Sequence, residues 1–350
     1  MEIRLIDSEA ATAPKIGLAL GSGSARGLAH LGVIRAIEEA GIDIRFIAGA
    51  SMGAFVGAVY ASGRLDALEA TFREFDWKKT ISFFDVVLPK SGLLDGAKIS
   101  KLVHQHVRAE GIENLPKMFH AVATDILSGE EVVIRGGDVI EAVRASLCVP
   151  GIFTPVRNNG RLLVDGGLVN PVPVSTVRAM GADIVIAVDL NHHIIAGKNM
   201  KPLRPQLTKP GESDNMSQTF ARWVGEYAGS MRDIKRRLLA RGAPKSAQFK
   251  QWISAEEPMP SIFEVLLASI NIMEANITQS RLRIDRPDLI IQPPLGHIRF
   301  LEFGRAEEII AIGYETARAQ LAARLPDLLR PKPGPAHLRR NARRVKAKAE

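Results

Sequence analysis

A serine between glycines is the first feature of this 350-residue chain that could do chemistry. Ser51 is the centre of Gly49-Ala50-Ser51-Met52-Gly53, which follows an apolar run and precedes a helical pattern. Such glycines permit a turn too tight for side chains, and the turn presents the serine hydroxyl at a sheet edge. A helix N-terminus at that place favours developing negative charge. The pattern predicts a nucleophile, and a plain strand-to-helix turn with a serine cap is the alternative.

Asp165 is the second candidate, because it follows the apolar run 162–164 and precedes Gly166 and Gly167. A carboxylate at a strand end can lie at the same sheet edge as Ser51 and accept the serine proton directly. The alternative is a turn aspartate that caps the two glycines. The pair predicts a serine nucleophile with a carboxylate base.

Residues 21–27, with the sequence GSGSARG, form a loop of small residues before a helical pattern. Backbone amides in such a loop can face an anion, and one use is an oxyanion hole for the reaction at Ser51. The competing use is a dinucleotide site, with Asp43 near the expected ribose-binding distance. That hypothesis is weakened because Arg26 stands where the third glycine of G-x-G-x-x-G belongs.

Histidines decide between a Ser–Asp pair and a catalytic triad. A triad hydrolase needs serine, acid and histidine in that order, and His192 and His193 follow Asp165, so the triad stays open. The other histidines are scattered and are interpreted as solvated or hydrogen-bonded residues. They are His30, His104, His106, His120, His297 and His337.

No His/Cys/Asp cluster has the spacing of metal ligands, so the sequence predicts no metal and no other cofactor. Cys148 is the single cysteine and lies in an apolar stretch, which predicts a buried, inert thiol. One cysteine excludes an intramolecular disulfide and suits a reducing cytoplasm.

Apolar runs that resemble strands alternate with helical patterns over the first 190 residues. This alternation predicts an α/β fold whose mostly parallel sheet is covered on both faces. The expected strands are 15–20, 44–48, 120–124, 132–134, 162–164 and 184–189, and the expected helices are 28–40, 54–61, 139–147 and 174–180.

The pattern changes after Asp189. Residues 191–215 contain three prolines and predict a long surface loop, and 217–241 predict an amphipathic helix with a basic face. Further elements are expected at 262–282 (helix), 288–292 (strand) and 306–325 (helix). The uncharged stretch 46–63 is rich in Gly, Ala and Ser and splits into a strand, a turn and a helix, which argues against a membrane span.

The loop with Arg26, the G-x-S-x-G pattern and the D-G-G pattern together resemble the patatin-like phospholipase family, in particular its bacterial branch related to neuropathy target esterase. The segments IGLALGSGSARGLAHLGVIRAIEEAGI, AGASMGAFVGAVYASG, RASLCVPGIFTPV and LLVDGGLVNPVPV carry the resemblance. It implies a three-layer α/β/α fold and a Ser–Asp dyad without histidine, with Ser51 as nucleophile and Asp165 as base. The implied oxyanion donors are the amides of Gly23 and Ser24, with Arg26 shaping the loop. The implied supporting residues are Gly21, Gly27, Gly49, Gly53, Gly166 and Gly167.

The resemblance implies hydrolysis of carboxylic esters of lipids such as phospholipids or lysophospholipids. The chain departs from the family where the usual glycine triplet reads Ser22-Gly23-Ser24. A serine can supply a backbone donor if its φ and ψ allow the required turn. The departure keeps a second class of function open, a non-catalytic binding or regulatory protein on the same scaffold.

The net charge of +8 is unevenly distributed, because residues 331–350 hold seven Lys/Arg and one acid. The nearly neutral body argues against a nucleic-acid-binding domain. We expect an N-terminal extension (1–14), a hydrolase domain (15–325) with a variable helical or lid insertion (191–287), and a disordered basic tail (326–350). With no secretory signal visible, we expect a cytoplasmic protein that contacts anionic membranes reversibly. The sequence does not indicate an oligomeric state.

Overall fold

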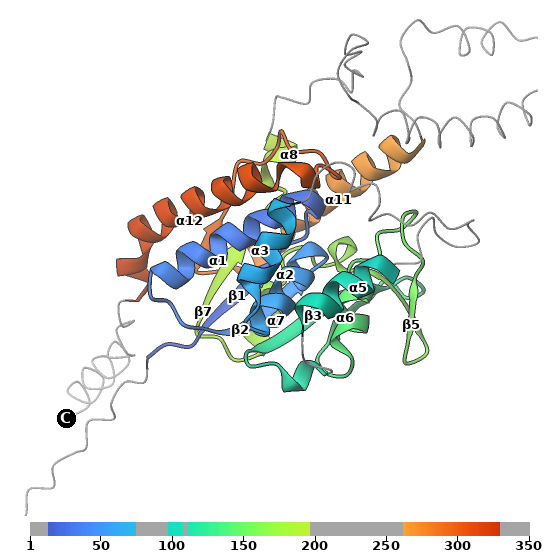
Figure 1. Ribbon diagram of the computed structural model, residues 1–350, viewed down its shortest axis with the longest axis horizontal. Helices are drawn as coiled ribbons and strands as arrows, with labels where there is room; N and C mark the ends of the chain where they lie inside the picture. The colour runs from blue at the N-terminus through green and yellow to red at the C-terminus, as the bar shows by residue number, and fades with distance from the viewer. Residues whose placement is uncertain (1–12, 75–96, 108–110, 197–261, 330–350) are drawn as a thin grey trace, which may run out of the picture.

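The computed structural model describes residues 13–74, 97–107, 111–196 and 262–329 (Figure 1). Within them, eight strands form one sheet in the order β5-β6-β3-β2-β1-β7-β8, with β4 paired to β3. Neighbours among β3, β2, β1, β7 and β8 are parallel, whereas β4 and β6 join β3 antiparallel and β5 pairs antiparallel with β6. The predicted mostly parallel α/β sheet is therefore confirmed. The strands are β1 (Ile16–Leu20), β2 (Ile44–Ala50), β3 (Met118–Asp125), β4 (Glu131–Ile134), β5 (Val156–Asn158), β6 (Arg161–Asp165), β7 (Ile184–Val188) and β8 (Leu289–Ile291).

Both faces of the sheet are buried, as the continuous apolar strands predict. Leu18 and Leu20 of β1 belong to the core on one face, together with α1 (Ala29–Glu39), α2 (Met52–Ala61) and α12 (Ala306–Leu328). Ala19, between them, belongs to a second core on the other face, under α7 (Val174–Ala179). Helices on both faces give the three-layer α/β/α arrangement.

The last described helix closes the domain by lying along the first. Figure 1 shows α12 beside α1, and the two backbones touch at glycines. A Cβ on Gly32 would lie 2.0 Å from the carbonyl oxygen of Ile310, and one on Gly313 would lie 2.3 Å from that of Ala29. The helix expected at 306–325 continues to Leu328, three residues into the segment expected to be the tail.

The remaining described helices include elements that the sequence patterns missed. Helix α8 occupies part of the stretch 191–215, which was expected to be loop, and α3 and α5 were not predicted. The rest of that stretch, the predicted helix 217–241 and the segment 331–350 lie outside the described residues. The helices are α3 (Leu65–Arg73), α5 (Ala97–His106), α6 (Val139–Ser146), α8 (His192–Ala196) and α11 (Ile262–Asp285), with 3₁₀ turns η1 (Ser24–Leu28), η2 (Ile112–Asn114), η3 (Gly166–Leu168) and η4 (Phe303–Arg305).

The uncharged stretch 46–63 comprises most of β2, a turn and α2, as predicted. Among the described helices, none combines the length and the apolar character needed to cross a membrane.

Candidate active site

Ser51 occupies a strained turn between β2 and α2. Its φ of 56° and ψ of −126° are unusual for a residue with a side chain. A Cβ on Gly49 would lie 2.2 Å from the carbonyl oxygen of Gly53, and a Cβ on Gly53 would lie 2.1 Å from that of Leu20. The turn therefore folds back on itself and against β1, and only glycine fits at either flank.

The Ser51 hydroxyl donates a hydrogen bond to Asp165 Oδ2 at 2.6 Å, and both residues are buried. Asp165 is the last residue of β6 and lies opposite Ala123 of β3. Although β6 runs against β3, this register brings its end level with the end of β2, because Ala50 pairs with Val122. Antiparallel pairing thus delivers the carboxylate to the edge where parallel strands end.

Two further neighbours orient the Asp165 carboxylate and its backbone. The N–H of Gly167 donates to Oδ1 at 2.7 Å, and the hydroxyl of Thr124 donates to the main-chain oxygen of Asp165 at 2.7 Å. Burial raises the pKa of Asp165 to about 6, while the hydrogen bonds from Ser51 and Gly167 oppose that rise. A carboxylate with this pKa can take up and return a proton near neutral pH.

Two backbone N–H groups of the loop 21–27 lack hydrogen-bond partners among the described residues. They belong to Gly23 and Ser24, whereas the neighbouring N–H groups donate to carbonyl oxygens: Ser22 to Pro171 at 2.8 Å and Ala25 to Phe300 at 3.0 Å. Ser24 has a φ of 49°, so a serine does adopt the left-handed conformation that a glycine would favour here. The loop can therefore offer two donors to an oxyanion beside Ser51.

The other glycines predicted to support the motifs lie where chain segments approach closely. A Cβ on any of them would lie between 2.1 and 2.6 Å from a neighbouring atom. These positions are Gly21 against Val188, Gly27 against Met52, Gly166 against Val122 and Gly167 against Glu274.

The structure adds two positioning residues that the sequence patterns did not identify. The Ser146 hydroxyl donates to the carbonyl oxygen of Val122 at 2.6 Å and accepts the N–H of Ser51 at 2.9 Å, so it fixes the serine turn. The ring Nε2 of His30 lies 2.8 Å from the carbonyl oxygen of Gly21. Burial lowers the pKa of His30 to about 4, so a neutral ring donates this bond.

Helix α11 also supplies residues to the site, although it falls in the range expected to be a variable insertion. The buried Arg26 side chain donates from Nη2 to Asn271 Oδ1 at 2.7 Å. The buried Glu274 accepts the hydroxyl of Ser22 at 3.0 Å. No motif marks residues 191–287, so the sequence carried no signal for either contact.

The residues behind the alternative chemistries lie apart from this pair. In the described part of the chain, no histidine side chain hydrogen-bonds to Ser51 or Asp165, and His192 and His193 lie on α8. Asp43 precedes β2 and is exposed, at the opposite end of that strand from the one where the loop 21–27 lies, so it does not fit a ribose-binding role.

Two further expectations concern the burial of Cys148 and the presence of metal ligands. Cys148 is buried, its thiol donates to the carbonyl oxygen of Thr154 at 3.2 Å, and burial raises the pKa of the thiol to about 12. The predicted buried thiol is confirmed. Among the described side chains, no group of three or more His, Cys, Asp or Glu could hold a metal ion.

An apolar pocket opens beside Ser51 and Ser24, and its empty space, counted together with the solvent space at its opening, is about 630 Å³. Aromatic side chains form much of its wall: Phe72 stacks on Phe303 with ring centroids 6.1 Å apart, and Phe55 meets Phe72 edge-on at 6.4 Å. Phe300 and Leu301 complete that side. A pocket of this kind accepts a hydrocarbon chain with its carbonyl end near Ser51.

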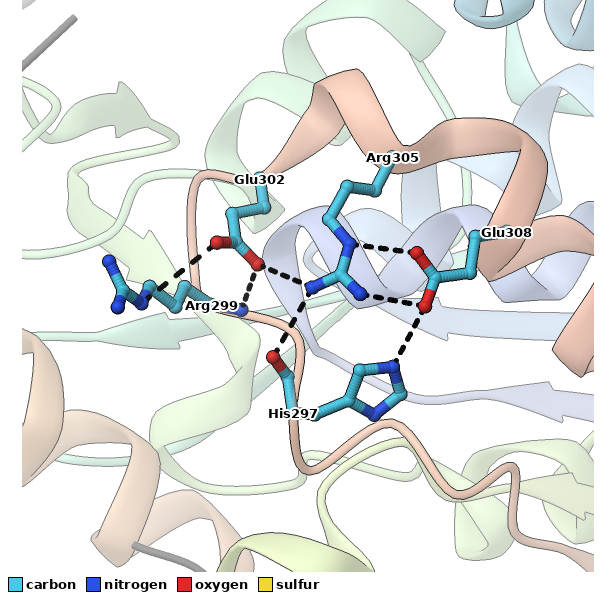
Figure 2. Close-up of polar contacts among 5 residues, drawn as sticks. All are labelled: His297, Arg299, Glu302, Arg305 and Glu308. Atoms are coloured by element: carbon cyan, nitrogen blue, oxygen red, sulfur yellow. Dashed lines mark hydrogen bonds and ion pairs between the residues drawn. The ribbon is translucent and has the colours of Figure 1, made fainter. Parts of the chain in front are cut away.

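Charged residues brace the segment that carries part of this wall (Figure 2). Arg305 binds both oxygens of Glu308, at 2.7 and 2.8 Å, and its Nη1 reaches Glu302 at 3.1 Å and the carbonyl oxygen of His297 at 3.4 Å. Glu302 also accepts the N–H of Arg299 at 2.9 Å. The arginine thus ties α12 to the turn that presents the pocket's aromatic residues.

The chain is similar to proteins of one family over most of its length. Residues 18–178 match the family model described as patatin-like phospholipase. An uncharacterized NTE family protein of Mycobacterium tuberculosis is 35% identical over 338 residues, covering 89% of this chain and 92% of that protein. A second one from the same organism is 33% identical over 317 residues, covering 90% of this chain and 48% of its own length. Patatin-like phospholipase domain-containing protein 6 of Mus musculus is 35% identical over 186 residues, covering 51% of this chain and 14% of its own.

Proposed function

This chain belongs to the NTE family of patatin-like phospholipase proteins, and from that premise we propose that it is a serine hydrolase of lipid carboxylic esters, such as phospholipids or lysophospholipids. The observation that carries the proposal is the 2.6 Å hydrogen bond from Ser51 to Asp165, with Ser51 lining an apolar pocket. The fold and the relatives support the hydrolysis of lipid esters in general. The Ser–Asp dyad and the substrate class are what we propose for this chain.

In the proposed reaction, Ser51 Oγ attacks the acyl carbonyl carbon while Asp165 Oδ2 takes the hydroxyl proton. The N–H groups of Gly23 and Ser24 donate to the oxygen that becomes negative. The tetrahedral intermediate collapses, and the alcohol leaves with the proton from Asp165. A water molecule then gives its proton to Asp165 and attacks the acyl-serine, which releases the fatty acid and restores both residues.

The pocket supports a substrate with at least one hydrocarbon chain, since its wall beside Ser51 is almost entirely apolar. The proposal for the whole chain is one catalytic domain over residues 15–325, extended to Leu328 by α12. It includes reversible contact with anionic membranes, which the basic segment 331–350 supports by its charge.

A substrate panel tests the proposal. Purified protein is assayed with p-nitrophenyl esters from butyrate to decanoate, with a lysophospholipid and with a diacyl phospholipid, using Ser51→Ala as the blank. We expect turnover by the wild type and a loss of at least about 10³-fold in Ser51→Ala. Absence of turnover on every ester by a folded wild type would instead favour the non-catalytic alternative.

A further inference from the structure

A second buried carboxyl group lies beside Asp165. Glu274 of α11 is 4% exposed, and its Oε1 borders the same small space next to Gly167 as Asp165 Oδ1. A Cβ on Gly167 would lie 2.4 Å from Glu274 Oε1 and 3.0 Å from Asp165 Oδ1. The proposed reaction uses Asp165 alone, so Glu274 is a buried titratable group at the site that the reaction does not explain.

Hydrogen bonds tie Glu274 to the loop that offers the oxyanion donors. Its Oε2 accepts the Ser22 hydroxyl at 3.0 Å and the Asn191 side-chain amide at 3.3 Å, and the same amide lies 3.2 Å from Ser22 Oγ. Ser22 directly precedes Gly23, the first loop residue whose N–H has no partner among the described residues. A glycine in place of Ser22 would have no hydroxyl for this network, so the link depends on this chain's own serine.

Burial and the nearby charge of Asp165 favour the neutral form of Glu274. Arg26 on η1 and Asp165 after β6 interact with it electrostatically, while Asp189 follows β7 and His193 lies on α8, which packs against α11. Burial first, and then the charge of Asp165, raise the pKa of Glu274 to about 8, against the opposing influence of Ser22, Arg26 and Asn191. Two carboxyl groups that share one site cannot both ionise easily.

We propose that Glu274 is a positioning residue of this site, which keeps its proton while Asp165 is ionised and holds Ser22 so that the Gly23 and Ser24 amides face the reacting carbonyl. The inference rests on the proposed hydrolase function. Loss of the proton from Glu274 places a second negative charge beside Asp165 and near the developing oxyanion, which opposes the reaction. The neutral form is therefore the active one.

The kinetic test compares two variants of Glu274 with p-nitrophenyl butyrate between pH 6 and 10, with Ser51→Ala as the blank. In the wild type, kcat should fall as pH rises through about 8. Glu274→Gln keeps an oxygen that can accept from Ser22 and Asn191, so kcat at pH 7 should stay within about twofold and the alkaline fall should disappear. Glu274→Ala removes the anchor, so kcat should drop by about tenfold or more while KM changes little.

A stability measurement tests the proton on Glu274 without using activity. A carboxyl group whose pKa rises from 4.5 to about 8 on folding stabilises the protein most below pH 4.5, and this contribution is lost as pH rises to about 8. Glu274→Gln has no such titration. Its melting temperature should therefore gain on that of the wild type as pH rises from 5 to 9. Glu315→Gln, an exposed site on α12, is the matched control and should show a constant difference.

These outcomes separate the inference from the proposed function. An active wild type whose alkaline fall persists in Glu274→Gln, with a melting-temperature difference independent of pH, would overturn the role of Glu274 and leave the hydrolase proposal intact. A folded wild type without esterase activity, but with a growing melting-temperature difference, would contradict the hydrolase proposal and support the proton on Glu274.

Discussion

The Ser51 hydroxyl donates directly to Asp165 Oδ2, at 2.6 Å, so we assign the proton transfer to that carboxylate. Asp165→Asn keeps the size of the side chain but its amide cannot take up the proton. We expect kcat for p-nitrophenyl butyrate to fall by about 10²- to 10⁴-fold. The double variant His192→Ala/His193→Ala should keep wild-type kcat. If circular dichroism shows that the double histidine variant is folded and yet it has no activity, the result would point to a triad.

The pKa of Asp165 sets the acid side of the pH profile. Burial raises that pKa to about 6, and only the ionised form can accept the serine proton. We therefore expect kcat/KM of the wild type to rise as pH increases through about 6 and to level off above it. A stopped assay with the uncharged ester between pH 4.5 and 7.5 measures this limb. A limb centred near the ordinary value for aspartate would mean that water reaches the carboxyl group.

Sequence patterns could predict some of these residues and not others. Ser51 and Asp165 belong to short sequence patterns whose glycines indicate a tight turn. Ser146, His30 and Glu274 are single polar residues within apolar or helical stretches, and such residues carry no pattern of their own. Their partners are set by the fold: Ser22 and Glu274 are 252 positions apart in the sequence.

Among the elements, the turn 297–305 carries part of the pocket wall. The polar contacts of Arg305 with Glu302, Glu308 and the carbonyl oxygen of His297 hold this turn in place (Figure 2). Arg305→Ala removes its bonds to Glu302 and Glu308, and an ion pair of this exposure is worth up to about 1 kcal/mol. We expect KM for p-nitrophenyl decanoate to rise up to about fivefold, because the long chain needs the wall. KM for the butyrate should hardly change.

Arg318→Ala is the matched control for this prediction. Arg318 lies on α12, the helix that begins directly after Arg305, pairs with Glu315 at 2.8 Å and is well exposed. It should leave both KM values unchanged. If Arg305→Ala raises KM equally for the short and the long ester, the turn does not contribute to binding of the long acyl chain.

Elements differ in how well the sequence predicts them. Continuous apolar runs such as β1 and β7 are clear because both faces of those strands are buried. The direction of β6 cannot be predicted from its five residues, because this direction depends on the strand with which β6 pairs. The sequence predicts a helix over 262–282, where α11 lies, but it does not predict the contact of α11 with the loop 21–27, because that contact is set by tertiary packing.

Over the whole molecule, the alternation of strands and helices was enough to predict a mostly parallel sheet covered on both faces. The sequence also shows how charge is distributed along the whole chain. Residues 331–350 carry seven bases and one acid, and a basic residue near an anionic surface contributes about 1 kcal/mol of attraction.

Liposome co-sedimentation tests what this charge does. At low salt, vesicles with 30% phosphatidylserine should sediment the full chain, and a variant ending at residue 330 should sediment less. Pure phosphatidylcholine vesicles are the control, and added salt should weaken the binding. Equal recovery in the supernatant with both kinds of vesicle would contradict membrane contact.

We assign Ser51 as the nucleophile of a Ser–Asp dyad, and labelling with an alkyl fluorophosphonate tests this assignment. The probe reacts preferentially with an activated serine and leaves a stable adduct, which peptide mass spectrometry assigns to a residue. We predict one adduct per chain, on Ser51, with labelling lost in Ser51→Ala and strongly slowed in Asp165→Asn. Labelling of folded Ser51→Ala at the wild-type rate, or an adduct on another serine of the wild type, would contradict the account.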